Sequence, residues 1–146
     1  MLQFTAKIDN NFLGRAARLM PNAQDCYLMA IDLHNVIRKR TQAGIDVDGK
    51  QFHEYAETTK KKKILLGRNP ELVDLTDKNR MLGQSIQTAP IQGGGRIYFA
   101  DANRREIAMR HNMGIGVPKR TFFSVSKRDF DEATANLQKR IAARAR

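Results

Sequence analysis

The sequence has few of the features by which enzymes, secreted proteins and membrane proteins are usually recognised. Its single cysteine, Cys26, excludes an intramolecular disulfide and cannot build a zinc site by itself. Apolar runs such as Ile64–Leu66 and Ile97–Ala100 are too short to cross a bilayer. The first ten residues have no charged start, apolar centre or small-residue cleavage site, so we expect no signal peptide.

Acidic residues are scarce relative to basic ones. The chain has 26 lysines and arginines against 15 aspartates and glutamates, which gives a formal net charge of +11 and a pI near 10.2. Such a surplus attracts polyanions, and contacts from Lys and Arg to phosphates give affinity without reading bases. The composition therefore favours nucleic acid nearby. There are two alternatives to a nucleic-acid partner. The protein is simply basic, or it is a basic subunit that contacts acidic protein surfaces.

The chain does contain enough apolar residues for one globular domain. Of its 146 residues, 41% are hydrophobic and 28% are charged, and a chain of this length can bury a single core. No internal repeat is visible. We therefore predict one domain over residues 1–146.

Hydrophobic periodicity predicts an α+β fold in which a small antiparallel sheet packs against two longer helices. The first longer helix is expected to follow Asn22, to run to about Gln42 and to end at Gly44. The second is expected to begin at a capping box formed by Ser126 and Asp129. The predicted core stripes of these helices are Tyr27, Ala30, Ile31, Leu33, His34 and Ile37, and Phe130, Ala133, Leu137 and Ile141.

Shorter patterns predict the remaining elements. A β-hairpin is expected from Ser85–Gln92 and Arg96–Ala100, with Gly93–Gly95 as a flexible tip. Asp101 is expected to cap a helix over Arg104–Met113. The other expected elements are strands over Leu2–Ile8 and Thr121–Val125, a helix over Asn10–Met20 and a short helical turn within Leu75–Leu82.

Residues 44–72 are predicted to form an extended basic loop. Asp48-Gly49 is a turn signal, because glycine accepts the positive backbone angle that such turns require. From Lys50 to Asn69 no clean periodicity is present, and Lys60–Lys63 is expected to be a solvated cationic run. Long irregular segments are uncommon in compact domains unless they are functional or disordered. The loop is therefore a candidate interaction segment.

The residue types that carry catalysis or bind metals do not occur in suitable groups. His34, His53 and His111 have neither metal-ligand spacing nor an acidic partner at a fixed helical offset. The turn at Asp46–Gly49 lacks the ligand pattern of a calcium-binding loop, and Gly93–Gly95 lacks the residues of a phosphate-binding loop. We therefore predict no catalytic residue, no metal site and no cofactor, and a protein that is not an enzyme.

Several basic clusters are better candidates for function. One cluster alone is typical of a solvated face. Four in a small domain without compensating acids favour a surface that faces a polyanion, and these are Arg38–Arg40, Lys60–Lys63, Arg104–Arg105 and Lys139–Arg146. The candidate residues for a DNA channel or another polyanion are Arg38, Lys39, Arg40, Lys60, Lys61, Lys62, Lys63, Arg144 and Arg146.

Four segments occur in an order that is similar to a known protein family. Gly44–Tyr55 (GIDVDGKQFHEY) has a DG turn followed by lysine and an aromatic residue, and Val73–Ile86 (VDLTDKNRMLGQSI) has the DLT, ML and SI elements. Ile107–Gly114 (IAMRHNMG) resembles Ala-x-x-His-Gln-x-Gly, with Asn112 in place of glutamine. Val117–Ser126 (VPKRTFFSVS) resembles Pro-x-Arg-x-Phe-x-x-x-Ser. Together these segments resemble the phage virion-morphogenesis, or tail-completion, proteins.

The resemblance implies a structural virion protein of the phage neck, between portal and tail tube, and no enzyme. Relatives assemble as rings, with a hexamer as the expected form, that complete or terminate the tail and join it to the head connector around the DNA channel. The expected partners are further copies, other neck, connector or tail-tube proteins, and genomic DNA that passes without sequence specificity, with no membrane. The expected location is the virion, and the host cytoplasm during assembly.

The resemblance also indicates which residues meet neighbouring subunits. The residues expected at a subunit or partner interface are Asp48, Gly49, Phe52, Tyr55, Met81, Leu82, His111, Pro118, Phe122 and Phe123. The terminator, completion and head-closure positions in the neck all stay open at this stage. A free-standing basic nucleic-acid-binding module is the alternative, motivated by the net charge alone.

Overall fold

The computed structural model describes residues 18–77, 80–81 and 85–145. Its elements are α2 (Ala23–Gln42), α3 (Glu57–Leu65), β1 (Thr76–Asp77), β2 (Arg80–Met81), β3 (Ile86–Ile91), β4 (Gly94–Phe99), α4 (Ala102–Met113) and α5 (Lys127–Arg144). The strand expected over Leu2–Ile8 lies outside the described residues, as does most of the helix expected over Asn10–Met20.

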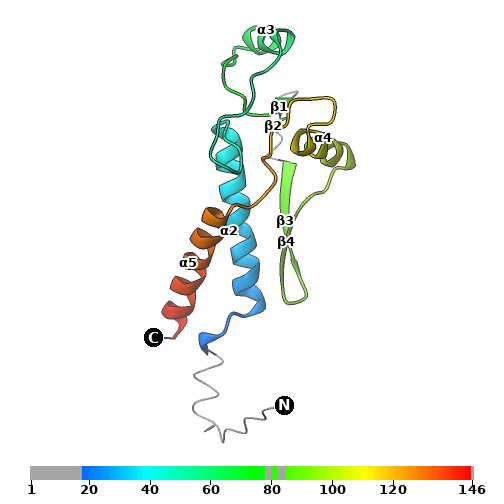
Figure 1. Ribbon diagram of the computed structural model, residues 1–146. Coiled ribbons are helices and arrows are strands. Elements are labelled where there is room, and N and C mark those ends of the chain that lie inside the picture. Colours follow the sequence, from blue (N-terminus) through cyan, green and yellow to red (C-terminus); the bar gives the residue numbers. More distant parts are fainter. Residues whose placement is uncertain (1–17, 78–79, 82–84, 146) are drawn as a thin grey trace, which may run out of the picture.

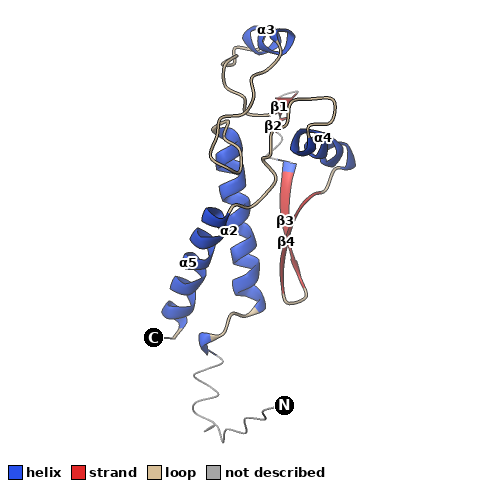
Figure 2. Ribbon diagram, viewed as in Figure 1, coloured by secondary structure: helices blue, strands red, loops and turns tan. Residues whose placement is uncertain are grey.

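Helix α2 is the central element of an elongated molecule (Figure 1). The β3–β4 hairpin packs along one side of α2, and α5 runs antiparallel to α2 along the other side. Helix α4 lies at the base of the hairpin, and α3 projects beyond the end of α2 (Figure 2). The predicted α+β fold is confirmed, with a small antiparallel sheet and two longer helices. The sheet packs mainly on one of them, α2.

Both longer helices begin at the residues that the sequence predicts. The Asn22 side chain accepts a hydrogen bond from the backbone N–H of Asp25 over 2.8 Å, and the Asp25 carboxylate accepts one from Asn22 N–H over 2.9 Å. Ser126 and Asp129 form the same reciprocal pair at 3.1 and 2.9 Å. These bonds satisfy backbone donors that the first turn of a helix leaves unpaired. Gly44, at a φ of +73°, follows α2 where the stop is expected.

The hairpin is confirmed, but its tip is shorter than predicted. Ile91 pairs with Gly94 at the end of the ladder, so the turn consists of Gln92–Gly93. The next glycine, Gly95, belongs to β4 and lies against α2. A Cβ atom added there would lie 2.9 Å from the Cβ of Ala30. Glycine at this position therefore allows the hairpin to approach the helix closely.

The hydrophobic core lies where the end of α2, the base of the hairpin, α4 and the segment before α5 meet. Phe99 contacts Phe122 edge to face, with ring centroids 6.4 Å apart, and Phe123 lies 4.9 Å from Phe99. The buried core cluster is Ile37, Phe52, Val73, Leu75, Ile86, Phe99, Ala108 and Phe122. The expected placement of Phe52 and Phe122 at an interface is wrong, because both side chains are buried in this core.

The predicted helix stripes are correct at most positions. Ala30, Ile37 and Ala133 are buried, and the remaining stripe residues are half-buried except Phe130. Phe130 is 52% exposed. The preceding residue, Asp129, faces α2 and pairs with an arginine there, so Phe130 lies about 100° further round the helix and points away.

Two predicted elements are replaced by different local structure. Thr121–Val125 forms no strand in the described chain, because the side chains of Arg40 and Asn112 bond its backbone in place of a neighbouring strand. In the described part of Leu75–Leu82, the chain forms the short antiparallel pair β1–β2 in place of the expected helical turn. Val73 is buried like Leu75 while the residue between them is not, and this period of two is that of an extended chain.

The segment from Lys50 to Asn69 is also more regular than predicted, because it contains α3. Glu57 lies in the first turn of this helix, and Lys62 and Lys63 lie in the last turn. Those charges complement the helix dipole. The helix has no apolar stripe because it projects from the body, which is why periodicity does not reveal it.

Candidate functional site

Residues 53–74, here called the arm, leave the end of α2, form α3 and return to the body (Figure 1). The interior of the arm is held by Lys63, which is buried. Its ammonium group donates to the backbone oxygen of Leu72 and to the Asp74 carboxylate, at 3.0 Å for the latter, and lies 4.8 Å from the centre of the Tyr55 ring. One lysine therefore joins the outgoing and returning chains.

Lys60 closes the arm in the same way. Its ammonium group lies 3.1 Å from Glu54, 3.6 Å from Glu57 and 3.5 Å from Glu71. The hydrogen bond to Glu54, with the nearby carboxylates, raises the pKa of Lys60. The prediction that Lys60–Lys63 is a solvated run is therefore wrong for Lys60 and Lys63.

The end of the arm exposes apolar side chains. Ile64 is 60% exposed, Leu65 is 85% exposed and Leu66 is 57% exposed, and they follow one another at the end of α3. Lys61 and Lys62 are exposed beside them. Contiguous exposed apolar groups mark interaction surfaces more often than scattered ones do. These five residues are called the arm tip.

Arg120 fixes the other end of the arm to the body. Its Nε donates to the backbone oxygen of His53 over 2.9 Å, and its Nη2 donates to that of Glu54 over 2.8 Å. Its Nη1 lies 3.3 Å from Nδ1 of His111, and its Cζ lies 5.3 Å from the centre of the Tyr55 ring. The arm base, formed by these five residues, thus joins the arm, α4 and the segment before α5.

The electrostatics of the arm base are set by burial. Burial, together with the charge of Arg120, lowers the pKa of His111 to about 4, so His111 is neutral at pH 7. Arginine has no acceptor atom, so Nδ1 of His111 accepts the hydrogen bond and the ring proton lies on Nε2. Burial also lowers the pKa of Arg120, which nevertheless keeps its charge.

A cavity of about 550 Å³ opens at the arm base. Its walls include Tyr55, Arg104, His111, Pro118 and Arg120. Three residues that the sequence places at an interface, Tyr55, His111 and Pro118, are therefore brought together around one cavity.

Arg40 and Asn112 brace the chain next to the arm base. Arg40 forms an ion pair with Asp129 and donates to the backbone oxygens of Phe122 at 3.0 Å and Ser124 at 2.7 Å. Asn112 accepts from the N–H groups of Phe122 and Phe123, both at 3.1 Å, and donates to the Phe123 oxygen at 2.9 Å. Both side chains therefore serve the fold.

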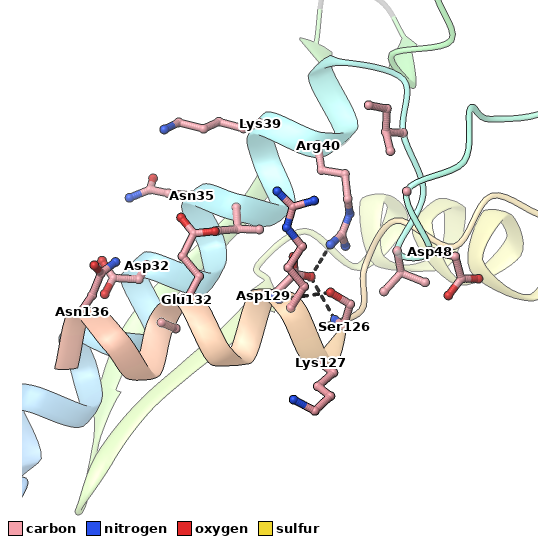
Figure 3. A pocket seen from close by; sticks show the side chains of 16 residues that line it. Asp32, Asn35, Lys39, Arg40, Asp48, Ser126, Lys127, Asp129, Glu132 and Asn136 are labelled. Carbon is pink, nitrogen blue, oxygen red and sulfur yellow. Dashed lines mark hydrogen bonds and ion pairs between the residues drawn. The ribbon is translucent and has the colours of Figure 1, made fainter. Parts of the chain in front are cut away.

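Figure 3 shows a second hollow, a groove of about 810 Å³ between α2 and α5. The Asp48-Gly49 turn, expected at an interface, lines it together with Arg40, Asp129 and Glu132. Burial alone would raise the pKa of Asp129, but hydrogen bonds from Ser126 and the Arg40 guanidinium lower it. Four acidic and four basic side chains line the groove, so it has no dominant charge.

The predicted polyanion-facing residues divide into two groups. Arg40, Lys60, Lys63 and Arg144 are engaged within the molecule; Arg144 pairs with Asp25 at 2.6 Å and donates to the backbone oxygen of Met20 at 2.8 Å. The members that are exposed and form no ion pair within the described chain are Arg38, Lys39, Lys61 and Lys62. Arg146, Leu82 and the side chain of Met81 lie outside the described residues.

The sequence did not predict that the side chains of Arg120 and Asn112 hold separate segments together. The available signal was the pair of motifs IAMRHNMG and VPKRTFF, which contain both residues. Spacing within each motif does not reveal that Arg120 meets His111 and that Asn112 meets Phe122, because both contacts cross a turn that only the fold defines.

A comparison of the chain with protein-family models, with curated proteins and with solved structures gave no match. Within the described residues, no group of His, Cys, Asp and Glu side chains could hold a metal ion. No helix in the same part of the chain is long and apolar enough to span a membrane.

Proposed function

We propose that this protein is a structural, non-enzymatic subunit of a phage neck. In this role, copies form a ring that completes or terminates the tail and joins it to the head connector around the DNA channel. The observation that carries the proposal is the resemblance of four ordered segments to tail-completion proteins. Its structural support is that all four meet at one place: Tyr55, Leu75, His111 and Arg120 line the same cavity.

The arm supplies a physical reason for assembly. It presents three exposed apolar side chains on a short helix, and its inner lysines hold it closed. Burying such side chains against a neighbour is favourable at roughly 25 cal/mol per Å² of apolar area. The arm tip is therefore the proposed contact with an adjacent subunit or partner ring.

The test is the state of the purified full chain. Native mass spectrometry and sedimentation velocity are expected to find closed oligomers, alone or on addition of purified connector or tail-tube protein. A chain that stays monomeric at high concentration and binds neither structure contradicts the proposal. The mass of the closed particle gives the copy number, for which a hexamer is expected.

A free-standing nucleic-acid-binding module is the second candidate, favoured by the net charge of +11 and by the exposed Arg38, Lys39, Lys61 and Lys62. The two candidates differ in the state that binds DNA. A monomer that binds duplex or single strands, with affinity falling steeply as salt rises, supports the module. Oligomers that bind DNA weakly and without sequence preference support the neck subunit.

A further inference from the structure

Arg120 is a buried cation whose charge no carboxylate offsets among the described residues. It is 3% exposed, and its guanidinium contacts two backbone oxygens and the neutral His111 ring. The other inward-facing cations considered above have carboxylate partners, Asp129 for Arg40 and Asp74 for Lys63. An isolated buried charge is costly, and carbonyl dipoles compensate it only in part.

The charges around the cavity leave this imbalance in place. Among the described residues of its wall, the only carboxylate belongs to Glu54, which lies 3.1 Å from Lys60 and has a 74% exposed side chain. Arg104 lines the cavity as a second guanidinium, and His53 and His111 are the other titratable groups there besides Tyr55. The described wall thus carries two guanidinium groups, and its Glu54 carboxylate is engaged by Lys60.

Arg120 also has donor capacity left. A guanidinium has five N–H donors in a planar fork, and the contacts to His53, Glu54 and His111 use one each. The fork matches the geometry of a carboxylate, and a charge-assisted bond of this kind is about twice as strong as a neutral one. The cavity volume of about 550 Å³ accommodates a side-chain carboxylate.

We propose that the cavity at the arm base is a carboxylate-binding site, which an aspartate or glutamate side chain of a neighbouring protein fills in the assembly. That the ligand is a carboxylate is inferred from the geometry alone. That the carboxylate comes from a neighbouring protein rests on the proposed neck function. A carboxylate on a flexible side chain reaches a buried guanidinium. A phosphate on the rigid backbone of duplex DNA does not, because Arg120 is 3% exposed.

His111 is a built-in reporter for this site, because it touches Arg120. In the dissociated full chain, acetate and N-acetylglutamate amide are titrated against chloride at equal ionic strength, with the His111 ring followed by NMR. Carboxylate binding is expected to raise the pKa of His111 from about 4 towards its ordinary value of 6.5. The neutral N-acetylglutamine amide is the matched ligand control. Equal curves in acetate and in chloride overturn the site.

Two variants separate binding from folding. Arg104→Gln, on the α4 wall, is expected to weaken acetate binding several-fold while the chain stays folded. Arg120→Lys keeps the charge but loses the planar fork, and is expected to abolish the acetate response even where the variant remains folded. An unchanged response in Arg120→Lys contradicts the proposed role of the guanidinium.

The source of the carboxylate is tested in assembled protein. His111 is expected to titrate at a higher pH in the oligomer than in the dissociated chain, without added acetate. If His111 titrates at the same pH in both states, a neighbouring protein is not the source of the carboxylate. The proposed function can fail independently of the site. If the chain never assembles but His111 still responds to acetate, the carboxylate site is supported and the neck function is contradicted.

Discussion

At the scale of single residues, three arginines hold together segments that secondary structure does not pair. Arg40 joins α2 to the chain before α5, Arg120 joins the arm to α4, and Arg144 joins the end of α5 to the start of α2. Each donates to backbone oxygens of another segment, and so satisfies acceptors outside the regular helix and strand pairing. In this molecule, arginine side chains therefore connect segments that no ladder joins in the described chain.

The first prediction concerns Arg40. Arg40→Met removes the partner of the mostly buried Asp129 and leaves the backbone oxygens of Phe122 and Ser124 without their donor. Loss of one partner from a buried ion pair is expected to lower the free energy of unfolding by about 3 kcal/mol. Urea denaturation followed by circular dichroism measures this change.

The matched control for Arg40→Met is Lys127→Met. Lys127 pairs with Asp131 at 2.6 Å, but its side chain is 89% exposed. A solvent-exposed pair contributes little, so the control is expected to change the free energy of unfolding by less than about 0.5 kcal/mol. If the two variants lose similar amounts of unfolding free energy, burial does not determine how much an ion pair contributes to stability.

The second prediction concerns pH and His111. The pKa of His111 is about 4 in the folded chain, against an ordinary value of 6.5. Between pH 4 and pH 6.5, His111 is therefore mostly protonated in the unfolded chain and mostly neutral in the folded chain. The free energy of unfolding is therefore expected to fall as the pH falls from 6.5 to 4, and His111 contributes no further loss below that window. Burial, aided by Arg38, lowers the pKa of His34 as well, which adds to the loss in the same direction.

The contribution of His111 is isolated by substitution. Glutamine keeps an acceptor for Arg120 but does not titrate, so His111→Gln is expected to flatten the pH dependence between pH 4.5 and 7 in urea titrations. His53→Gln is the control, because His53 is exposed. This variant is expected to show the same dependence of the free energy of unfolding on pH as the wild type. An equally steep slope in His111→Gln would remove His111 as its cause.

At the scale of elements, the contact of the hairpin with α2 organises the body. Gly95 lies where β4 touches α2, and an added Cβ would be 2.9 Å from Ala30 and 3.0 Å from the backbone of Tyr27. Gly95→Ala is therefore expected to push the hairpin from the helix and to cost about 1–3 kcal/mol. Thermal unfolding of the variant measures this as a lower Tm.

The adjacent glycine is the control for this substitution. A Cβ at Gly94 would meet only the Cβ of Cys26, at 3.6 Å, which is an ordinary contact. Gly94→Ala is expected to leave the Tm within a few degrees of the wild type. If both alanine variants unfold at the same temperature, the close approach at Gly95 is not what requires glycine.

Local signals made several elements predictable from the sequence. Two helix starts, at Asn22 and Ser126, and one helix end, at Gly44, could be predicted. Each depends on hydrogen bonds between residues no more than four positions apart, so the local sequence contains the signal. Thr121–Val125 has the composition of a strand, yet its bonding partners, Arg40 among them, lie far away in sequence. Structure determined by distant side chains could not be predicted from the local pattern.

The candidate site divides in the same way. Tyr55, His111 and Pro118 could be named from motifs, and the fold brings them to one cavity. The roles of the lysines in the arm could not be predicted, because a run of four gives no sign that Lys63 turns inward to Asp74 while its neighbours stay exposed. Helical spacing separates the inward lysines from the outward ones only once α3 is known.

At the scale of the whole molecule, a net positive charge is combined with an exposed apolar cluster at the arm tip. The arm tip lies at one end of the elongated body and the hairpin turn lies at the other (Figure 1). The surplus of 26 basic over 15 acidic residues makes copies repel one another. Association of copies therefore needs an apolar contact, and the arm tip is the most exposed one in the described chain.

The last prediction follows from this arrangement. Leu65→Asp places a carboxylate at the most exposed position of the arm tip, where no intramolecular packing is lost. The free energy of unfolding is expected to stay within about 0.5 kcal/mol of the wild type, while association weakens by at least tenfold because the charge must be desolvated in the interface. Sedimentation velocity over a concentration series measures the association.

Ile91→Asp is the matched control for Leu65→Asp, because Ile91 is 48% exposed and lies at the turn of the hairpin, at the opposite end of the body. Both variants gain the same negative charge, which reduces the general repulsion between copies. A loss of association in Leu65→Asp alone assigns the contact to the arm tip, because the change in net charge is identical. If both variants associate like the wild type, subunits meet through another surface, and the arm has a different role in the assembly.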